Sequence, residues 1–509
     1  MDLLPNSPES IWKLGIVLII AIGAYLTTSR SSIPVLRRLS LRGRRDSTAK
    51  TPPRSLSPDN KRSTSPPESY SHVLPPHRRE SLLQLQAHCF RWRNVTEAEV
   101  RQNILPMTAD YMTSPGNLYT PTGFTVEQVK TLGDFPDYAT LCGVPLPNPY
   151  PEHNIEKALP RPFRPFRWTY HQTMSLTKLE TDWWIELENT YKSRIAQRKA
   201  LYAKHGKAVL DALPGSELAC KELMEMVLQF VCARYPQYFS VVDKRILQNR
   251  ILETEQDIRS KPPLEILIDN IPEDFAIMLR DDQTGYYFMR AGVICSALGW
   301  NVGSKIGKQL HEIHAPIPDY KEKMQFSMDR CVMFLLGRMT LQCKADSMEQ
   351  VFHEDADGQA HPTGLVGSRG REPLYMPPGD PHEALRLTQD PNLTLDECNL
   401  RVDWQTLRRL PISAGVVFNF KALFTPVSEF RDEPGVPALI AKVLKEGKES
   451  LMRYKGTWHV QHVILPKLEE WTKEQEDLGI MPKGWEVTTL DESPWFRNWE
   501  EKWHRQQGF

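Results

Sequence analysis

The stretch from Thr28 to about Arg79 most restricts what this chain can fold into, because it holds very little that could form a hydrophobic core. It is rich in Ser, Pro and Arg, as in TPPRSLSPDNKRSTSPPESYS. Such a composition cannot bury enough apolar surface to offset the entropy of ordering the chain. We therefore expect residues 28–80 to form a disordered linker and the main fold to lie after it.

A short apolar segment precedes this linker. No charged residue interrupts the run from Leu14 to Leu26, and Ile11 and Trp12 extend it. After a short flank, residues 1–10, this segment predicts a single transmembrane anchor at 11–27, although the run is shorter than the about 20 residues of a typical span. A signal peptide, a transit peptide and a buried helix are the alternatives.

The charges around the apolar segment indicate its orientation. Asp2 and Glu9 precede it, whereas many arginines follow it. This order is opposite to the positive start of a signal peptide. By the positive-inside rule it places the rest of the chain in the cytosol, so we expect a single-pass membrane protein, most simply of the endoplasmic reticulum.

Composition and known signatures exclude several classes of function. Lys and Arg together number 63 and so do Asp and Glu, so the chain lacks the basic excess of nucleic-acid-binding proteins. The eight cysteines include no C-x-x-C pair, which argues against a zinc site or a disulfide framework. Signatures of serine hydrolases, zincins, dinucleotide folds, P-loop enzymes and P450 thiolate ligands are absent.

The remaining chain divides into three parts. We expect residues 81–164, which have many prolines and no clear period, to wrap the surface of the domain that follows. The main domain is predicted at 165–480, with a loop insertion at 345–396 that is rich in Asp, Gly, Pro and His. Residues 481–509 are expected to form a C-terminal tail.

The periodicities within the main domain predict an α+β fold. GSELACKELMEMVLQFVCARY carries an apolar stripe at helical spacing, and GVVFNFKALF alternates as a strand does. Because no βαβ spacing or phosphate loop occurs, an antiparallel sheet with flanking helices is the simplest arrangement.

The stretch HEIHAPIPDY, His311–Tyr320, contains two candidate metal ligands. Pro316 and Pro318 end any helix that passes through His311 and leave His314 on a stiff backbone. A metal-bound imidazole needs its ring held in one orientation, which such a backbone favours. His311 could share the same helical face. The alternative is a rigid turn whose imidazoles face water.

A second candidate site lies in NLRVDWQTLRRLP. As a strand, this stretch places Arg401, Asp403 and Gln405 on one face and Trp404 on the other. If the polar face lines a pocket, the guanidinium can polarise a bound oxygen species and the carboxylate can hold an ammonium group or relay a proton. The alternative is an ordinary water-facing strand.

These stretches, taken in order, resemble the haem-dependent oxidative N-demethylase-like proteins, including the fungal HRQ family proteins. The resemblance runs from about Pro165 to about Trp471 and rests on MSLTKLETDWWIELENTY, ALPG, RYP, GYYFMRAGVICSALGW, KIGKQLHEIHAPIPDY and LRVDWQTLRRLP. It implies a PAS-like domain that binds haem b, activates O₂ and oxidises a secondary amine at an N-methyl carbon, releasing formaldehyde. In bacterial members, electrons arrive from NADPH through separate flavin and iron-sulfur subunits. This chain has no such motifs, so we expect a partner reductase.

The resemblance also assigns roles to individual residues. His314 matches the histidine of the family's I-H-x-P-x-P-x-Y element and is the expected proximal haem ligand, whereas His311 has no matching role. Arg401, Asp403 and Gln405 fall on the family's L-R-V-E-R-Q-T-L-R-R-L-P element and are the expected catalytic residues.

This chain departs from that element in two places. It has Asp403 and Trp404 where the common pattern has Glu and Arg, and we expect the change to reshape the distal pocket. Arg408 and Arg409 form a basic spot suited to a carboxylate such as a haem propionate, or to solvent.

The leading expectation is a membrane-anchored haem-dependent monooxygenase that acts on an amine or a secondary metabolite. One alternative is a haem-binding sensor or interaction module that has lost catalysis. Another is a scaffold without haem.

Overall fold

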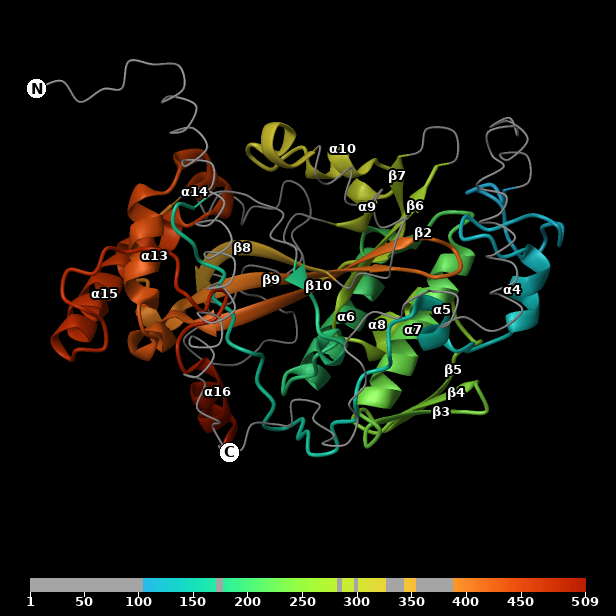
Figure 1. Ribbon diagram of the computed structural model, residues 1–509, viewed down its shortest axis with the longest axis horizontal. Coiled ribbons are helices and arrows are strands. Elements are labelled where there is room, and N and C mark those ends of the chain that lie inside the picture. The colour runs from blue at the N-terminus through green and yellow to red at the C-terminus, as the bar shows by residue number, and fades with distance from the viewer. Residues whose placement is uncertain (1–103, 171–176, 282–285, 297–300, 326–342, 354–387) are drawn as a thin grey trace, which may run out of the picture. The chain divides into compact units, whose positions relative to one another are not determined.

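The computed structural model describes residues 104–170, 177–281, 286–296, 301–325, 343–353 and 388–509. All of them lie in the second of two units into which the chain divides, Pro53–Phe509. Figure 1 shows the course of the chain through this unit.

A seven-stranded antiparallel sheet forms the centre of this unit. Its strand order is β1-β8-β9-β10-β6-β7-β2. The longest contact joins β9 to β10 along their whole length, from Val416 opposite Arg409 to Pro426 opposite Asn399. A separate three-stranded antiparallel sheet has the order β3-β4-β5. The strands are β1 Thr177–Lys178, β2 Leu210–Ala212, β3 Phe239–Val242, β4 Ile246–Asn249, β5 Thr254–Asp257, β6 Asp274–Arg280, β7 Tyr287–Val293, β8 Cys343–His353, β9 Cys398–Arg409 and β10 Val416–Pro426.

One face of the large sheet packs against the helices α6 (Tyr191–His205), α7 (Glu217–Arg234) and α8 (Pro263–Asn270). Figure 1 shows these helices together on one side of the sheet. The apolar stripe predicted for α7 is confirmed, because its members are at most 2% exposed and belong to the main core: Leu223, Met226, Val227, Phe230 and Val231.

The other face carries a smaller core beneath α9 (Val302–Lys305) and α10 (Leu310–His314). A π-helical turn follows at Tyr320–Met324. This core joins helix residues to alternate strand residues: Leu310, Ile313 and Tyr320 pack with Met278, Met289, Leu407 and Phe418. The sheet therefore has two buried faces, and successive residues of β9 point alternately into the main and the smaller core.

The remaining helices flank the sheet. The C-terminal group connects to β10 through the 3₁₀ helix η8 (Val427–Asp432). Residues 481–509, expected as a tail, include α16, whose Trp503 is buried. The other 3₁₀ helices are η3 Thr181–Trp183, η4 Gly206–Ala208 and η7 Leu395–Glu397, and the other α-helices are α4 Val126–Leu132, α5 Tyr138–Cys142, α13 Val436–Glu446, α14 Glu449–Lys455, α15 Trp458–Asp477 and α16 Trp499–Gln507.

The predicted α+β class with an antiparallel sheet and flanking helices is confirmed. The predicted insertion needs correction, because its first part is β8, which pairs with β9 in the sheet. Residues 354–387 of that insertion lie outside the described residues. The insertion therefore begins later than its composition indicated.

The expected membrane location is also corrected. Across the described ranges, no helix combines the length and apolar character needed to cross a membrane. The segment 11–27 and the linker 28–80, on which that expectation rested, lie outside the described residues.

Candidate functional site

The imidazole of His314 is held in one orientation by two contacts. Its Nδ1 lies 2.7 Å from the carbonyl oxygen of Leu310, and its ring stacks on Tyr320 with centroids 5.2 Å apart and planes 14° apart. Because a carbonyl oxygen only accepts, Nδ1 carries the proton and the lone pair is on Nε2. A fixed ring with its lone pair on Nε2 is the arrangement that a metal-binding histidine needs.

The charge state of His314 suits the same role. Burial lowers the pKa of its imidazole to about 4, and Lys305 adds a smaller effect in the same direction. The ring is therefore neutral near pH 7, as a metal ligand must be. His311 lies elsewhere, with its ring edge-on to Tyr286 at 6.5 Å.

The backbone around His314 explains this placement. The side chain of Gln309 caps α10, and the carboxylate of Glu312 accepts a hydrogen bond from the backbone N–H of Gln309. After the helix, Asp319 has a positive φ of 60° and pairs with Lys448 at 2.5 Å. The turn that the prolines predicted is thus tied to the start of α14.

Strand β9 brings the predicted polar residues to the same face of the sheet as α10. Arg401, Asp403, Gln405 and Arg409 alternate along β9 in phase with Leu407, which packs with α10 in the smaller core. Arg401 and Asp403 are only 1% and 7% exposed, so this is no water-facing strand surface.

Arg401 and Asp403 form a buried ion pair. Nε of Arg401 lies 3.0 Å from Oδ1 of Asp403, and Nη2 lies 2.8 and 3.1 Å from its two oxygens. Nη2 also donates to the carbonyl oxygen of Ser296 at 2.5 Å. The third nitrogen, Nη1, is buried without a hydrogen-bond partner among the described residues. The pair therefore offers one cationic donor to a ligand.

The predicted basic spot at Arg408 and Arg409 is divided between the two faces of the sheet. The guanidinium of Arg408 lies 4.1 Å from the ring centroid of Trp184, and its Nη2 lies 3.7 Å from Sγ of Cys142. Arg409 shares the face of Asp403, and burial lowers the pKa of both arginines. Because neighbouring strand residues alternate, Arg408 does not join the candidate site.

The expected effect of Trp404 on the pocket is also corrected. Trp404 points into the main core, away from Asp403, and packs edge-on against Phe163 with ring centroids 4.7 Å apart. The guanidinium of Arg161 lies 5.0 Å from its ring centroid. The tryptophan therefore belongs to the packing of the N-terminal segment against the sheet.

Sequence reasoning missed three residues next to the candidate site. Asp274, at the start of β6, accepts hydrogen bonds from the backbone N–H groups of Cys295 and Ser296 at 3.0 and 2.8 Å. It also pairs with Arg198 of α6, and Arg194 lies one helical turn before Arg198. Two arginines four residues apart on a helix that packs against the core are a signal for buried charge, and the sequence contains it.

No three His, Cys, Asp or Glu side chains converge as metal ligands in the part of the chain that the structure describes. The donor that the site offers to a metal is thus a single oriented imidazole. That is the protein donor that haem iron takes in many haem proteins.

A comparison with known families identifies the chain. The model of the family described as "Haem-dependent oxidative N-demethylase, alpha subunit-like" matches residues 175–465. The matched range is more than half of the chain and includes α6, α10, β9 and β10. This chain therefore belongs to the haem-dependent oxidative N-demethylase alpha-subunit-like family.

Proposed function

We propose that this protein is a haem-dependent oxidoreductase that oxidises an amine or a related secondary metabolite, and that His314 is the residue that would hold the iron of haem b. The observation that carries the proposal is the His314 imidazole. It is neutral, and its Nδ1–H donates a hydrogen bond to the carbonyl oxygen of Leu310 at 2.7 Å. A haem iron that is held by a histidine needs this donor, so the residues present fit the group. The PAS-like character of the domain is part of the same proposal.

The residues of β9 supply the polar groups on the same face. When bound, haem provides the activation of O₂ and the oxidation of a carbon next to nitrogen. The guanidinium of Arg401 orients an anionic or oxygen-bearing group, because Asp403 and Ser296 O hold it in place. Gln405 adds an amide on this face, and Arg409 a cation for a carboxylate.

Asp403 has the role of holding a proton or an ammonium group. Its carboxylate lies within hydrogen-bond distance of Arg401 and is 7% exposed, so a substrate amine would share it with that guanidinium. Electrons come from NADPH through a partner reductase that carries flavin and iron-sulfur centres, since the family resemblance implies separate subunits for them.

The absorption spectrum tests the ligand assignment. We expect protein reconstituted with haem to show a Soret band, and His314→Ala to weaken haem binding at least about tenfold and to shift the band, because the axial nitrogen is lost. His311→Ala is the matched control and should leave the band unchanged, since His311 lies beside Tyr286. A protein that binds no haem, or a His314→Ala variant with the spectrum of the wild type, contradicts the proposal.

A second candidate function is a haem-binding sensor or interaction module without catalysis. The double contact between Arg401 and Asp403 favours it, because a carboxylate already paired with a guanidinium is a weaker partner for an amine. Formaldehyde release from a panel of N-methyl amines, dependent on NADPH and a reductase, separates the two candidates. An enzyme should release it and lose most activity in Asp403→Asn, whereas a sensor should release none.

A further inference from the structure

Arg408 is a buried cation that has no carboxylate beside it. Its side chain is 7% exposed, its guanidinium lies 4.1 Å from the ring centroid of Trp184, and its Nη2 lies 3.7 Å from Sγ of Cys142. Burial lowers the pKa of Arg408, and among the described residues only the thiol of Cys142 opposes this effect. Arg408 forms no ion pair within the described ranges. Its positive charge therefore lacks a carboxylate counter-charge.

The buried carboxylates on the neighbouring elements are engaged with other groups. They are Glu222 and Glu225 on α7 and Asp182 in η3. Glu225 lies 3.0 Å from the ammonium group of Lys221, and Asp182 lies 3.7 Å from the guanidinium of Arg234. Glu222 accepts its hydrogen bonds from the turn between β9 and β10. None of the three acts on the pKa of Arg408. The neighbouring elements thus leave this guanidinium without a counter-charge.

Two hydrogen-bond donors at this place also lack acceptors. Nε of Arg408 and Nε1 of Trp184 are buried and have no hydrogen-bond partner in the described structure. Trp184 is only 2% exposed, so bulk water does not satisfy its donor. A buried donor without an acceptor destabilises the fold, and a charged one does so more strongly. A bound species that accepts hydrogen bonds would relieve this cost.

A small cavity adjoins Arg408. Its lining joins residues 144–147 to Met226 and Phe230 of α7, and it includes Thr181 and Arg408. The centre of a water-sized sphere has about 10 Å³ in which to move there. The cavity therefore holds one water molecule or one slightly larger monatomic ion. Water accepts hydrogen bonds but leaves the buried charge uncompensated, whereas a monovalent anion does both.

We propose that Arg408 and this cavity form a binding site for a small monovalent anion such as chloride. The anion neutralises the guanidinium and stabilises the packing of residues 144–147 against α7 and β9. The site lies on the face of β9 opposite Arg401 and Asp403, so it does not depend on the proposed haem function.

The melting temperature of the full-length chain in chloride and in gluconate, at constant ionic strength, tests the site. Gluconate carries the same charge but is too large for the cavity. We expect chloride to raise the melting temperature of the wild type by about 2 °C or more, and to do so saturably. Arg408→Met should melt at the same temperature in both salts, whereas Arg408→Lys, which keeps the cation, should retain part of the response. Arg409→Met is the matched control, because it removes the same charge from the other face of the strand and should respond as the wild type does.

Crystals of the wild type soaked in bromide give a second measurement that does not require a variant to fold. The anomalous signal of bromide should appear within hydrogen-bond distance of the Arg408 guanidinium. A water molecule there, together with equal melting temperatures of the wild type in the two salts, overturns the proposal. Cys142→Ala tests whether a thiolate is the counter-charge instead. In that case the wild type shows no chloride response and Cys142→Ala gains one, which also overturns the proposal.

Discussion

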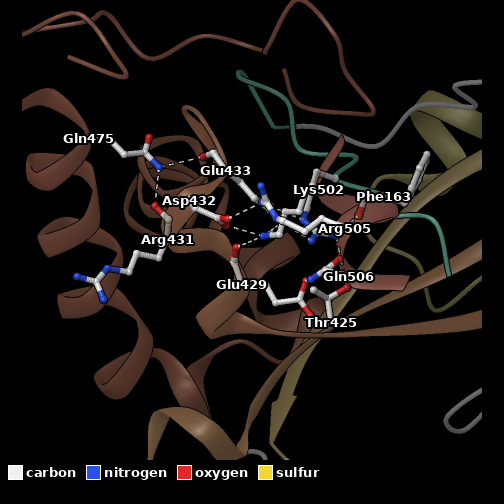
Figure 2. A network of polar contacts seen from close by, with 11 residues as sticks. Phe163, Thr425, Glu429, Arg431, Asp432, Glu433, Gln475, Lys502, Arg505 and Gln506 are labelled. Atoms are coloured by element: carbon white, nitrogen blue, oxygen red, sulfur yellow. Dashed lines mark hydrogen bonds and ion pairs between the residues drawn. The ribbon is translucent and has the colours of Figure 1, made fainter. Parts of the chain in front are cut away.

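Two buried arginine clusters differ in how completely the chain itself satisfies them. In the first, Arg164 uses all three nitrogens: Nε and Nη2 each lie 2.7 Å from an oxygen of Glu433, and Nη1 donates to Phe163 O at 3.1 Å. Glu433 also pairs with a second cation, because Nζ of Lys502 lies 3.1 Å from its carboxylate. The same Nζ lies 2.6 Å from Oδ1 of Asp432, as Figure 2 shows. The second cluster, Arg194 with Arg198 and Arg401, has four buried nitrogens without a partner among the described residues.

This difference separates a structural role from a binding role. The first cluster joins the segment before β1, the turn η8 and α16, which lie far apart in the sequence. Its charges balance within the chain, so it stabilises the fold without a ligand. The second cluster lies beside the candidate site and has an excess of hydrogen-bond donors. Buried cations that the chain leaves unsatisfied are therefore the better guide to a binding site.

The largest expected effect comes from breaking the saturated cluster. Glu433→Gln leaves Arg164 and Lys502 buried without their carboxylate, which should lower the free energy of unfolding by about 3–5 kcal/mol. Denaturant unfolding measures the loss. Glu474→Gln is the control, because its pair with Arg431 is similar in length at 2.7 Å but exposed, and exposed pairs contribute about 0–1 kcal/mol. Similar losses in the two variants would contradict the structural role of the first cluster.

A smaller effect is expected at Trp404. Trp404→Arg introduces a guanidinium next to Arg161, which already lies 4.1 Å from the ring centroid of Trp183, and removes the packing on Phe163. We expect a loss of about 2–4 kcal/mol in denaturant unfolding. The spectrum of the haem-loaded protein should stay unchanged, because this side chain faces away from Asp403. Trp404→Phe should lose less unfolding free energy than Trp404→Arg. A changed spectrum with unchanged stability would place Trp404 in the site after all.

The smallest effect tests whether neutral hydrogen bonds can replace a counter-charge. Glu222 is fully buried and accepts hydrogen bonds from Ile412 N at 2.5 Å and from the backbone N–H and hydroxyl of Ser413 at 3.0 and 2.7 Å. These donors lower its pKa, but burial outweighs them and raises it to about 7. Unlike Glu433, this carboxyl has only neutral donors, and its charged form is disfavoured.

The raised pKa makes stability depend on pH with a defined sign. Between the unfolded value of 4.5 and about 7, the folded state holds the proton of Glu222 and the unfolded state releases it. The stabilisation is therefore complete below pH 4.5 and is lost as pH rises through 7. Glu222→Gln should reduce the fall in unfolding free energy between about pH 5 and about pH 8 by about 1–2 kcal/mol. Part of the pH dependence should remain in this variant, because burial also raises the pKa of Glu273 to about 7. An unchanged pH profile would show that Glu222 is ionised throughout.

Much of the fold could be predicted because it depends on local patterns. The period of α7 indicates which of its side chains are buried, in agreement with the structure. The alternation of β10 separates the two faces of the strand, because Val416 and Phe418 lie in the smaller core and Val417 lies in the main core. The proline turn after His314 likewise depends on its own residues. The grouping of Arg408 with Arg409 failed although the information was local, since the alternation of a strand already separates adjacent residues. The membrane prediction relied on a segment outside the described residues, and the described ones contain no spanning helix.

The sequence by itself determined the family, the α+β class and the two stretches that carry His314 and Arg401. Only the tertiary structure decided which charges neutralise one another. Arg164 meets Glu433 across 269 residues of sequence, and Arg401 meets Ser296 across 105. Ion pairs act through space over a few ångströms, so the partner of a buried charge follows from the packing of distant segments and not from neighbours in the chain. For the same reason, the contacts that join Arg198 to Asp274 and Arg401 to Ser296 became visible only after α6 and β9 were placed together.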